Sequence, residues 1–229
     1  MNKNTAPPAI TIDGPSGSGK GSIAKRLANY LSWHILDSGA LYRLTALSAQ
    51  QQSIALDNIP AVAAVARSLD VEFVAGSKNQ PVSVLLSERD VTDRIRTEQC
   101  GSMASQIAPY KEVRSALLQR QRDFLKEPGL IADGRDMGTV VFPEANCKLF
   151  ITASPEERAR RRQLQLKQQG HSVKIAHLLR EIKERDDRDM NRSNAPLKPA
   201  DDAITIDTSE QTLDEVFQTV LAIWQEKQH

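Results

Sequence analysis

Short apolar runs alternate with helical spacing through both ends of the chain. Runs of four or five mostly apolar residues predict strands at 9–13, 33–36, 130–133, 148–152 and 203–207. Helical spacing follows at about 19–31 and again from Leu213 to Trp224, where apolar residues recur at i, i+3, i+4 and i+7. Strands that alternate with helices favour an α/β fold with a parallel sheet.

Two helix starts carry capping sequences. Ser154-Pro155-Glu156-Glu157 offers a cap, a proline at the first helical position and a capping-box glutamate, and Gly170 is expected to end this helix. Thr212 and Glu215 form a second capping box ahead of the last helix. Both sequences predict where a helix begins.

The stretch from about Pro60 to Pro128 follows a different pattern. Segments 70–75 and 82–86 are predicted to be strands joined by a polar turn at 76–80, with a third strand near 89–92 and two helices, the second near 112–125. Consecutive strands with short turns favour a small antiparallel sheet, which we interpret as an insertion into the parallel fold. The alternative is that these strands extend the main sheet.

Composition excludes several classes of protein. The 229 residues are 40% hydrophobic and 26% charged, and no apolar run approaches the roughly 20 residues that span a bilayer. The first residues lack an apolar signal segment, and two cysteines make no disulfide framework, so we expect a reduced, cytoplasmic protein without a membrane partner. A net charge of +1 argues against a nucleic-acid partner.

That near-neutral total hides a basic segment. Residues 156–192 hold 11 basic and 7 acidic residues, whereas the remainder holds 19 basic and 22 acidic. Arg158, Arg161 and Arg162 have the spacing of one helix face, and Arg185, Arg188, Asp189 and Arg192 have the spacing of another, with Asp186 and Asp187 on a different stripe. Taken alone, such a run indicates a solvated, salt-bridged surface. Beside a site that binds an anion, the same run of arginines indicates positive charge that helps to bind that anion.

A glycine-rich loop between the first strand and the first helix supplies such a site. It consists of Gly14, Pro15, Ser16, Gly17, Ser18, Gly19, Lys20, Gly21 and Ser22. Glycines let successive N–H groups turn toward an anion, the helix N-terminus adds partial positive charge, and the lysine reaches the β- and γ-phosphates. The sequence therefore predicts a site for nucleotide phosphates.

The loop departs from the usual pattern at one position. Gly21 stands where a Ser or Thr directly after the lysine would hold Mg²⁺, and the hydroxyl is that of Ser22. This Gly-Lys-Gly-Ser form resembles nucleoside monophosphate kinases, and Ser22 is expected to bind the metal directly or through water. Asp133, at the end of a strand, either holds a metal-bound water or caps a turn.

Four motifs in order resemble the bacterial cytidylate kinase family. They are Ile12-Asp-Gly-Pro-Ser-Gly-Ser-Gly-Lys-Gly-Ser22, Leu36-Asp-Ser-Gly-Ala-Leu-Tyr-Arg43, Ile131-Ala-Asp-Gly-Arg-Asp-Met-Gly-Thr139 and Lys183-Glu-Arg-Asp-Asp-Arg-Asp189. The resemblance implies a P-loop three-layer α/β fold with a five-stranded parallel sheet. Its core would be 1–60 and 130–229, with a helical lid at about 155–172 and a CMP-binding insertion at 61–129.

The resemblance also implies roles for individual residues. The loop from Gly14 to Ser22 would bind the phosphates of ATP, and Arg161 with its neighbours would lie on the lid. The residues around the cytosine would be Ser38, Ser105, Arg114 and Asp136. The sugar would contact Arg185 and Asp189. The acceptor phosphate or the transferring group would meet Arg43, Arg135 and Arg192. Catalysis would fall to Lys20, Arg135, Arg161 and Arg192.

The chemistry of the base agrees with this assignment. Cytosine carries a donor at N4 and acceptors at N3 and O2, so a carboxylate such as Asp136 accepts from N4 while Arg114 donates to N3 or O2. Uracil instead carries an acceptor oxygen at position 4 and a donor at N3, so Asp136 would face an acceptor and Arg114 a donor. We therefore expect CMP and dCMP to be preferred over UMP.

The expected reaction is ATP-dependent phosphorylation of CMP and dCMP with Mg²⁺ by a monomer. Three alternatives remain. They are a kinase for UMP or AMP, a kinase of the shikimate or gluconate type, and a non-catalytic nucleotide-binding module. A sugar hydroxyl would need a general base, which no histidine or carboxylate pattern supplies, and a regulatory switch would carry an Asn-Lys-x-Asp motif, which is absent.

Overall fold

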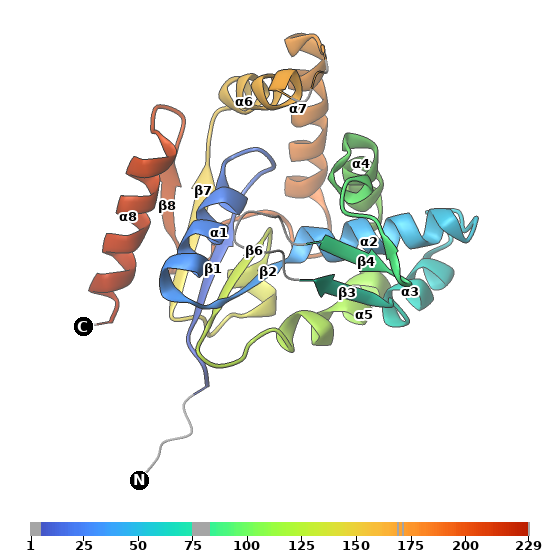
Figure 1. The fold of residues 1–229 in the computed structure, drawn as a ribbon, viewed down its shortest axis with the longest axis horizontal. Helices are drawn as coiled ribbons and strands as arrows, with labels where there is room; N and C mark the ends of the chain where they lie inside the picture. Colours follow the sequence, from blue (N-terminus) through green and yellow to red (C-terminus); the bar gives the residue numbers. More distant parts are fainter. Residues whose placement is uncertain (1–5, 75–82, 169, 171, 229) are drawn as a thin grey trace. The chain divides into compact units, whose positions relative to one another are not determined.

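The computed structural model describes residues 6–74, 83–168, 170 and 172–228 (Figure 1). The predicted turn at 76–80 and the neighbouring ends of its strands lie outside these residues. The helices and strands, in chain order, are β1 (Ala9–Asp13), α1 (Lys20–Leu31), β2 (His34–Asp37), α2 (Ser38–Gln51), α3 (Ile59–Arg67), β3 (Val71–Val74), β4 (Ser83–Leu86), β5 (Arg89–Asp90), η1 (Arg94–Arg96), α4 (Glu98–Ile107), α5 (Lys111–Arg122), β6 (Leu130–Gly134), η2 (Met137–Val141), β7 (Cys147–Thr152), α6 (Pro155–Gln168), α7 (Ile175–Asn191), β8 (Ile204–Asp207) and α8 (Leu213–Glu226).

The chain divides into two compact units. One runs up to Asp37 and resumes at Gln121, and the other is Ser38–Arg120. The second unit thus starts ahead of the predicted insertion, because it includes α2, and it ends before the predicted end. The boundaries 61–129 stay a prediction. No helix in the described part of the chain is both long and apolar enough to cross a membrane.

The larger unit contains a five-stranded parallel sheet in the order β2-β6-β1-β7-β8. The central strands β1 and β6 are buried at every position, whereas the edge strand β8 is mostly exposed and the edge strand β2 is exposed at both of its ends. Strands buried on both faces need continuous apolar runs, and these runs are what marked them in the sequence. The predicted α/β fold with a five-stranded parallel sheet is confirmed.

The chain order changes direction beside β1. After β1 the next two strands of this sheet, β2 and β6, lie on one side of it, and β7 and β8 lie on the other. Ligands of open α/β sheets bind at the carboxyl ends of the strands at such a reversal. The glycine-rich loop follows β1 directly, and in Figure 1 it lies at the same end of the sheet as α6 and α7.

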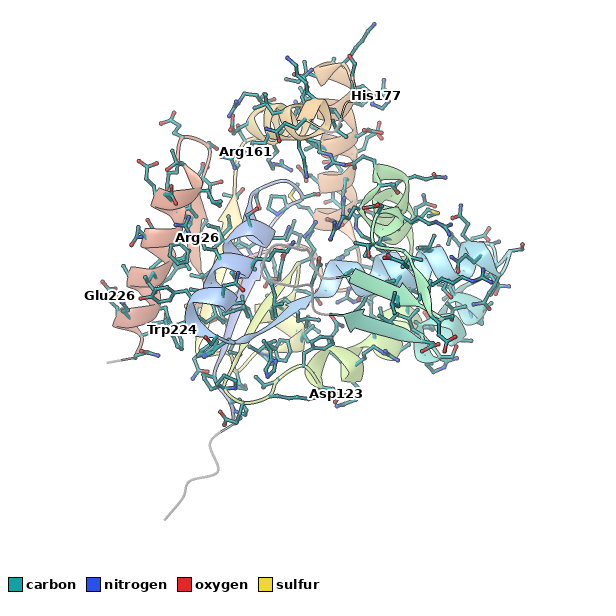
Figure 2. All side chains as sticks on the ribbon, in the orientation of Figure 1. Arg26, Asp123, Arg161, His177, Trp224 and Glu226 are labelled. Carbon is teal, nitrogen blue, oxygen red and sulfur yellow. The ribbon has the colours of Figure 1, made fainter. Side chains whose placement is uncertain are left out.

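Helices α1 and α8 pack against one another, with the core of the larger unit beneath them. Trp33 and Trp224 meet edge to face with ring centroids 5.2 Å apart, and Trp224 is labelled in Figure 2. The predicted capping box that starts α8 is confirmed, because the Thr212 hydroxyl accepts from the Glu215 N–H and the Glu215 carboxylate accepts from the Thr212 N–H.

Only half of the predicted capping box forms at the start of α6. The Ser154 hydroxyl accepts from the Glu157 N–H at 3.2 Å, as expected. The Ser154 N–H instead donates to the Ser209 hydroxyl, and the Glu157 carboxylate binds Arg160 and Arg161. Two guanidinium groups compete better for a carboxylate than one backbone N–H does.

The smaller unit contains a separate sheet. Strands β3, β4 and β5 pair antiparallel in that order and share no pairing with the parallel sheet. The alternative in which they extend the main sheet is therefore wrong. Helices α2 and α4 pack against each other in this unit, with η1 beside both.

Gly14 is where the loop leaves the sheet, and its conformation demands glycine. Its φ is +149°, and a Cβ added there would stand 2.0 Å from the backbone oxygen of Ile151. A backbone atom cannot swing aside as a side chain can. The close approach therefore ties the first residue of the loop to β7.

We expect Gly14→Ala to lower the free energy of unfolding by about 3 kcal/mol or more, because it adds a backbone clash to an unfavourable φ. Urea unfolding measures the change. Gly17→Ala is the matched control, since its φ is +79° but the nearest atom to its Cβ, on Arg158, lies at 3.4 Å. Equal losses in the two variants would contradict this account of Gly14.

Candidate active site

The glycine-rich loop leaves the start of α1 open to an anion. The N-cap residue is Gly19, with φ of +90°, so it has no side chain with which to satisfy the first N–H groups of the helix. The Ser18 hydroxyl is fully buried in the loop and has no hydrogen-bond partner in the structure. A helix N-terminus with this geometry is suited to bind phosphate oxygens.

Lys20 lies buried inside the loop. Its ammonium donates to the carbonyl of Pro15 at 3.1 Å and lies 3.9 Å from a carboxylate oxygen of Asp133. Burial and the nearby Arg135 lower the pKa of Lys20, whereas Asp133 opposes that change. Burial likewise raises the pKa of Asp133, against the charge of Lys20. An incoming phosphate would favour the charged lysine.

Asp133 also lies beside the residue that separates Lys20 from the loop hydroxyl. A Cβ added to Gly21 would stand 3.1 Å from Asp133 Oδ2, so glycine leaves room for the carboxylate there. Ser22 is exposed on the first turn of α1. Oxygen donors of these two kinds suit Mg²⁺. The described residues contain no group of three His, Cys, Asp or Glu that could hold a metal, so such an ion would take its remaining ligands from water and phosphate.

Asp13 connects the end of β1 to the segment after β6. Its two carboxylate oxygens accept from the N–H groups of Met137 and Gly138, each at 2.8 Å. Burial raises the pKa of Asp13 to about 7, and Asp136 and Asp133 add to the increase while the two N–H groups oppose it. Asp13 thereby fixes the segment that carries Arg135 and Asp136.

Arg135 and Asp189 form a buried ion pair in front of the sheet. The Arg135 Nε donates to Asp189 at 3.0 Å. Burial would raise the pKa of Asp189, but Arg135, Arg185 and Arg192 together hold it below its usual value. The structure therefore gathers three of the predicted arginines around one carboxylate.

Arg158 is buried and binds Asp186 rather than facing solvent with its neighbours. Its guanidinium contacts the two carboxylate oxygens at 3.0 and 2.5 Å, and it also donates to the carbonyls of Ala153 and Ser16. The three arginines with the spacing of one helix face therefore do not share one role. They are Arg158, Arg161 and Arg162. Arg158 ties α6, α7 and the glycine-rich loop together.

Arg161 is the arginine of α6 that faces the segment after β8. Figure 2 labels it on α6, at the end of the sheet where the loop lies. Its guanidinium donates to the hydroxyl and the carbonyl of Thr208, and its Nε binds Glu157 at 2.8 Å. Hydrogen bonds from Arg160 first, and then from Arg161, lower the pKa of Glu157 to about 2. Arg162 binds Gln165 instead.

Arg43 belongs to the smaller unit and is held there by backbone. Its Nη1 donates to the carbonyls of Ile95 and Thr97 at 2.6 and 2.9 Å. Gly101 lies against the guanidinium, since a Cβ there would stand 2.7 Å from Nη2. The junction between η1 and α4 therefore sets the position of Arg43.

The remaining predicted residues have defined places in one unit or the other. Ser38 begins α2, Ser105 is buried on α4, and Arg114 on α5 donates to the carbonyl of Ala108 at 3.3 Å. In the larger unit, buried Asp136 precedes η2 and Arg192 caps the end of α7. Lys20, Asp133, Arg135, Arg185, Asp189 and Arg192 belong to one electrostatic cluster.

Comparison with known proteins decides the family. The Cytidylate kinase family model matches residues 10–226. The chain belongs to this family. A cytidylate kinase of Shewanella sp. (strain MR-4) is 55% identical over 214 residues, which are 93% of each chain. That of Nitrosococcus oceani is 55% identical over 93% of this chain and 94% of its own, and that of Pseudomonas fluorescens is 55% identical over 96% of each.

Three buried contacts of this cytidylate kinase family member were not predicted from its sequence. They are the Asp13 link to η2, the Arg158–Asp186 pair and the Thr208 contacts with the loop and Arg161. Asp13 and Thr208 share one signal, a polar residue at or just after the end of a strand. Each partner is distant in the sequence, so that signal does not identify it.

We expect the stability difference between Asp13→Asn and the unaltered chain to depend on pH. Between about pH 4 and pH 7 the folded chain keeps a proton on Asp13 that the unfolded chain has released, so a rise in pH weakens folding through this group. The variant lacks this group. Its free energy of unfolding relative to that of the unaltered chain should therefore rise by about 1–2 kcal/mol between pH 5 and pH 7.

Urea unfolding at pH 5, 6 and 7 measures this difference. The exposed Asp201→Asn variant is the control and should stay parallel to the unaltered chain. A difference between Asp13→Asn and the unaltered chain that stays constant with pH would show that Asp13 does not titrate in this range.

Proposed function

We propose that this chain transfers the γ-phosphoryl group of ATP to the phosphate of CMP, and of dCMP, forming ADP and CDP or dCDP. The observation that carries the proposal is the position of Lys20, buried in a phosphate-binding loop beside a cluster of arginines on the same unit. Membership of the cytidylate kinase family names the acceptor.

The arginines do most of the chemical work in this proposal. Phosphoryl transfer spreads negative charge over equatorial oxygens, so catalysis depends on positioning and on neutralising that charge. Lys20, Arg135 and Arg192 supply positive charge from the larger unit. The Arg135–Asp189 contact orients the guanidinium while leaving further N–H groups for phosphate oxygens.

The proposal needs no general base. The acceptor oxygen belongs to a phosphate that is already ionised at neutral pH, unlike the hydroxyl of a sugar. Attack in line with the leaving ADP therefore requires alignment of two anions that repel one another. Positive charge on Lys20, Arg135 and Arg192 serves this purpose, and the resemblance to the family adds Arg43 as a contact of the acceptor phosphate.

We propose Mg²⁺ as the cofactor, held by Asp133 and Ser22 through water. The ion would supply charge neutralisation at the phosphate oxygens. The support is the carboxylate beside Gly21 and the loop hydroxyl that follows it. Asp133 also favours the charged form of Lys20, because it opposes the lowering of the Lys20 pKa by burial.

The base is read by one carboxylate and one guanidinium. Buried Asp136 accepts from N4 of cytosine, Arg114 donates to N3 or O2, and Ser38 and Ser105 contribute hydroxyls. Arg185 and Asp189 contact the sugar. In UMP the same groups would face an acceptor and a donor respectively, which leaves buried polar groups unpaired.

The remaining parts of the proposal concern the lid and the cellular setting. Arg161 and the helix α6 that carries it close over ATP and exclude water. The protein works as a monomer in the cytoplasm, with small nucleotides as its partners. Cys100 and Cys147 are both buried and not joined, which fits a reducing compartment.

Formation of ADP with ATP and each of CMP, dCMP, UMP and AMP tests the proposed function. We expect rapid ADP formation with CMP and dCMP and much slower formation with the other two. A faster rate with UMP or AMP would assign the chain to another acceptor. ATP binding without any acceptor-dependent ADP release would favour a non-catalytic module.

We expect Asp136→Ala to lower the CMP-over-UMP ratio of kcat/KM by about 10- to 100-fold, because a hydrogen bond to a charged group contributes about 1.5–3 kcal/mol. The loss should fall on CMP, whose N4 donor loses its acceptor. Exposed Asp201→Ala is the control and should keep the original ratio. An unchanged ratio in Asp136→Ala would make this assignment wrong.

A further inference from the structure

Thr208 is a buried threonine that directly follows the edge strand β8. Its side chain and backbone are 2% exposed, although β8 itself is mostly exposed. The Thr208 N–H donates to the carbonyl of Thr152 at 2.8 Å, which fixes the residue at the end of β7.

The hydroxyl of Thr208 lies between the phosphate-binding loop and Arg161. Its Oγ1 lies 3.1 Å from the carbonyl oxygens of both Ser18 and Thr152, which share its single O–H hydrogen, and it accepts from Arg161 Nη1 at 3.0 Å. The Thr208 carbonyl accepts from Arg161 Nη2. One hydroxyl thus contacts both the loop and a guanidinium of α6.

The contact with the Ser18 carbonyl determines the direction of the next N–H group. In a planar trans peptide the C=O and the N–H point in opposite directions, so a carbonyl held toward Thr208 turns the Gly19 N–H away from it. Gly19 has φ of +90° and lacks a Cβ to restrict the peptide before it. The Thr208 hydroxyl supplies the restriction that glycine lacks.

Arg161 is held by Thr208 without being neutralised by it. The threonine hydroxyl and carbonyl are uncharged. Of the two anions near Arg161, Glu157 also binds Arg160 through both carboxylate oxygens at 2.7 and 2.8 Å, and Asp207 binds Ser209. A guanidinium oriented mainly by neutral acceptors keeps charge for a phosphate. Thr208 therefore lies where it can orient two groups, the Ser18–Gly19 peptide and the Arg161 guanidinium, toward the same anion.

We propose that Thr208 is a positioning residue of the phosphoryl-donor site: its hydroxyl orients the Ser18–Gly19 peptide and the Arg161 guanidinium for the phosphates of ATP. This inference rests on the proposed function, because it takes the loop as the ATP site. It predicts an effect on ATP and none on the acceptor nucleotide.

The test compares variants that remove or keep the hydroxyl. Thr208→Val and Thr208→Ala remove it, the first with nearly the same shape, whereas Thr208→Ser keeps it. Thr205→Val makes the same change at an exposed position of β8 and is the control. For each protein, calorimetric titration gives the dissociation constant of ATP, and steady-state assays give separate KM values for ATP and CMP and the value of kcat.

We expect Thr208→Val to weaken ATP binding by about 5- to 20-fold, because two buried hydrogen bonds are lost. The KM for ATP should rise in parallel and kcat should fall, while the KM for CMP stays within about twofold. Thr208→Ser should bind ATP within about twofold of the unaltered chain. Thr208→Ala repeats the comparison and keeps the test valid if the valine variant does not fold.

Two results would overturn the inference. One is an ATP affinity in the valine and alanine variants equal to that of the unaltered chain. The other is an equal loss in Thr208→Ser, or a loss of CMP affinity as large as that of ATP, either of which would indicate a general structural role. Failure of the unaltered chain to phosphorylate CMP would refute the proposed function instead, and the ATP titrations would still decide the role of Thr208.

Discussion

A buried ammonium group at the carboxyl end of a parallel sheet is the feature on which the rest of the site depends. The ammonium of Lys20 is buried, donates to one backbone carbonyl and lies 3.9 Å from one carboxylate oxygen. Burial lowers its pKa. A buried cation with so little compensation is costly unless an anion completes it. Arg135, Arg185 and Arg192 around Asp189 add further cations to the same cluster. This cluster of buried cations is suited to anionic ligands such as the phosphates of the proposed nucleotides.

Such a loop also has to be held in place, and each of its supports comes from a different element. Gly14 packs against the backbone of β7, Arg158 reaches the Ser16 carbonyl from α6, and Thr208 reaches the Ser18 carbonyl from the end of β8. Backbone N–H groups bind phosphate well only when their directions are set in advance, because reorientation during the reaction costs free energy. Asp13 extends this support to the segment that presents Arg135 and Asp136.

Local features of the sequence predicted most of the fold, whereas the site that they indicate at the glycine-rich loop stays a prediction. The buried central strands β1 and β6 are mostly apolar runs, and β1 coincides with its predicted range 9–13, because strands buried on both faces are mostly apolar. Contacts between distant residues could not be predicted in the same way. Helical spacing placed Arg158 and Arg161 on one face. In the structure Arg158 binds buried Asp186, whereas Arg161 binds Thr208 directly after β8. Ser154 failed to complete its capping box because Ser209, 55 residues later, binds its N–H.

The central claim is that a phosphoryl group passes from ATP to the phosphate of CMP at this loop. ATP labelled in its γ-phosphate, mixed with the enzyme, Mg²⁺ and CMP, tests it directly when the label is followed through the products. The account predicts that the label appears in CDP in step with the ADP formed. Label that appears as inorganic phosphate while CMP stays unchanged would contradict it.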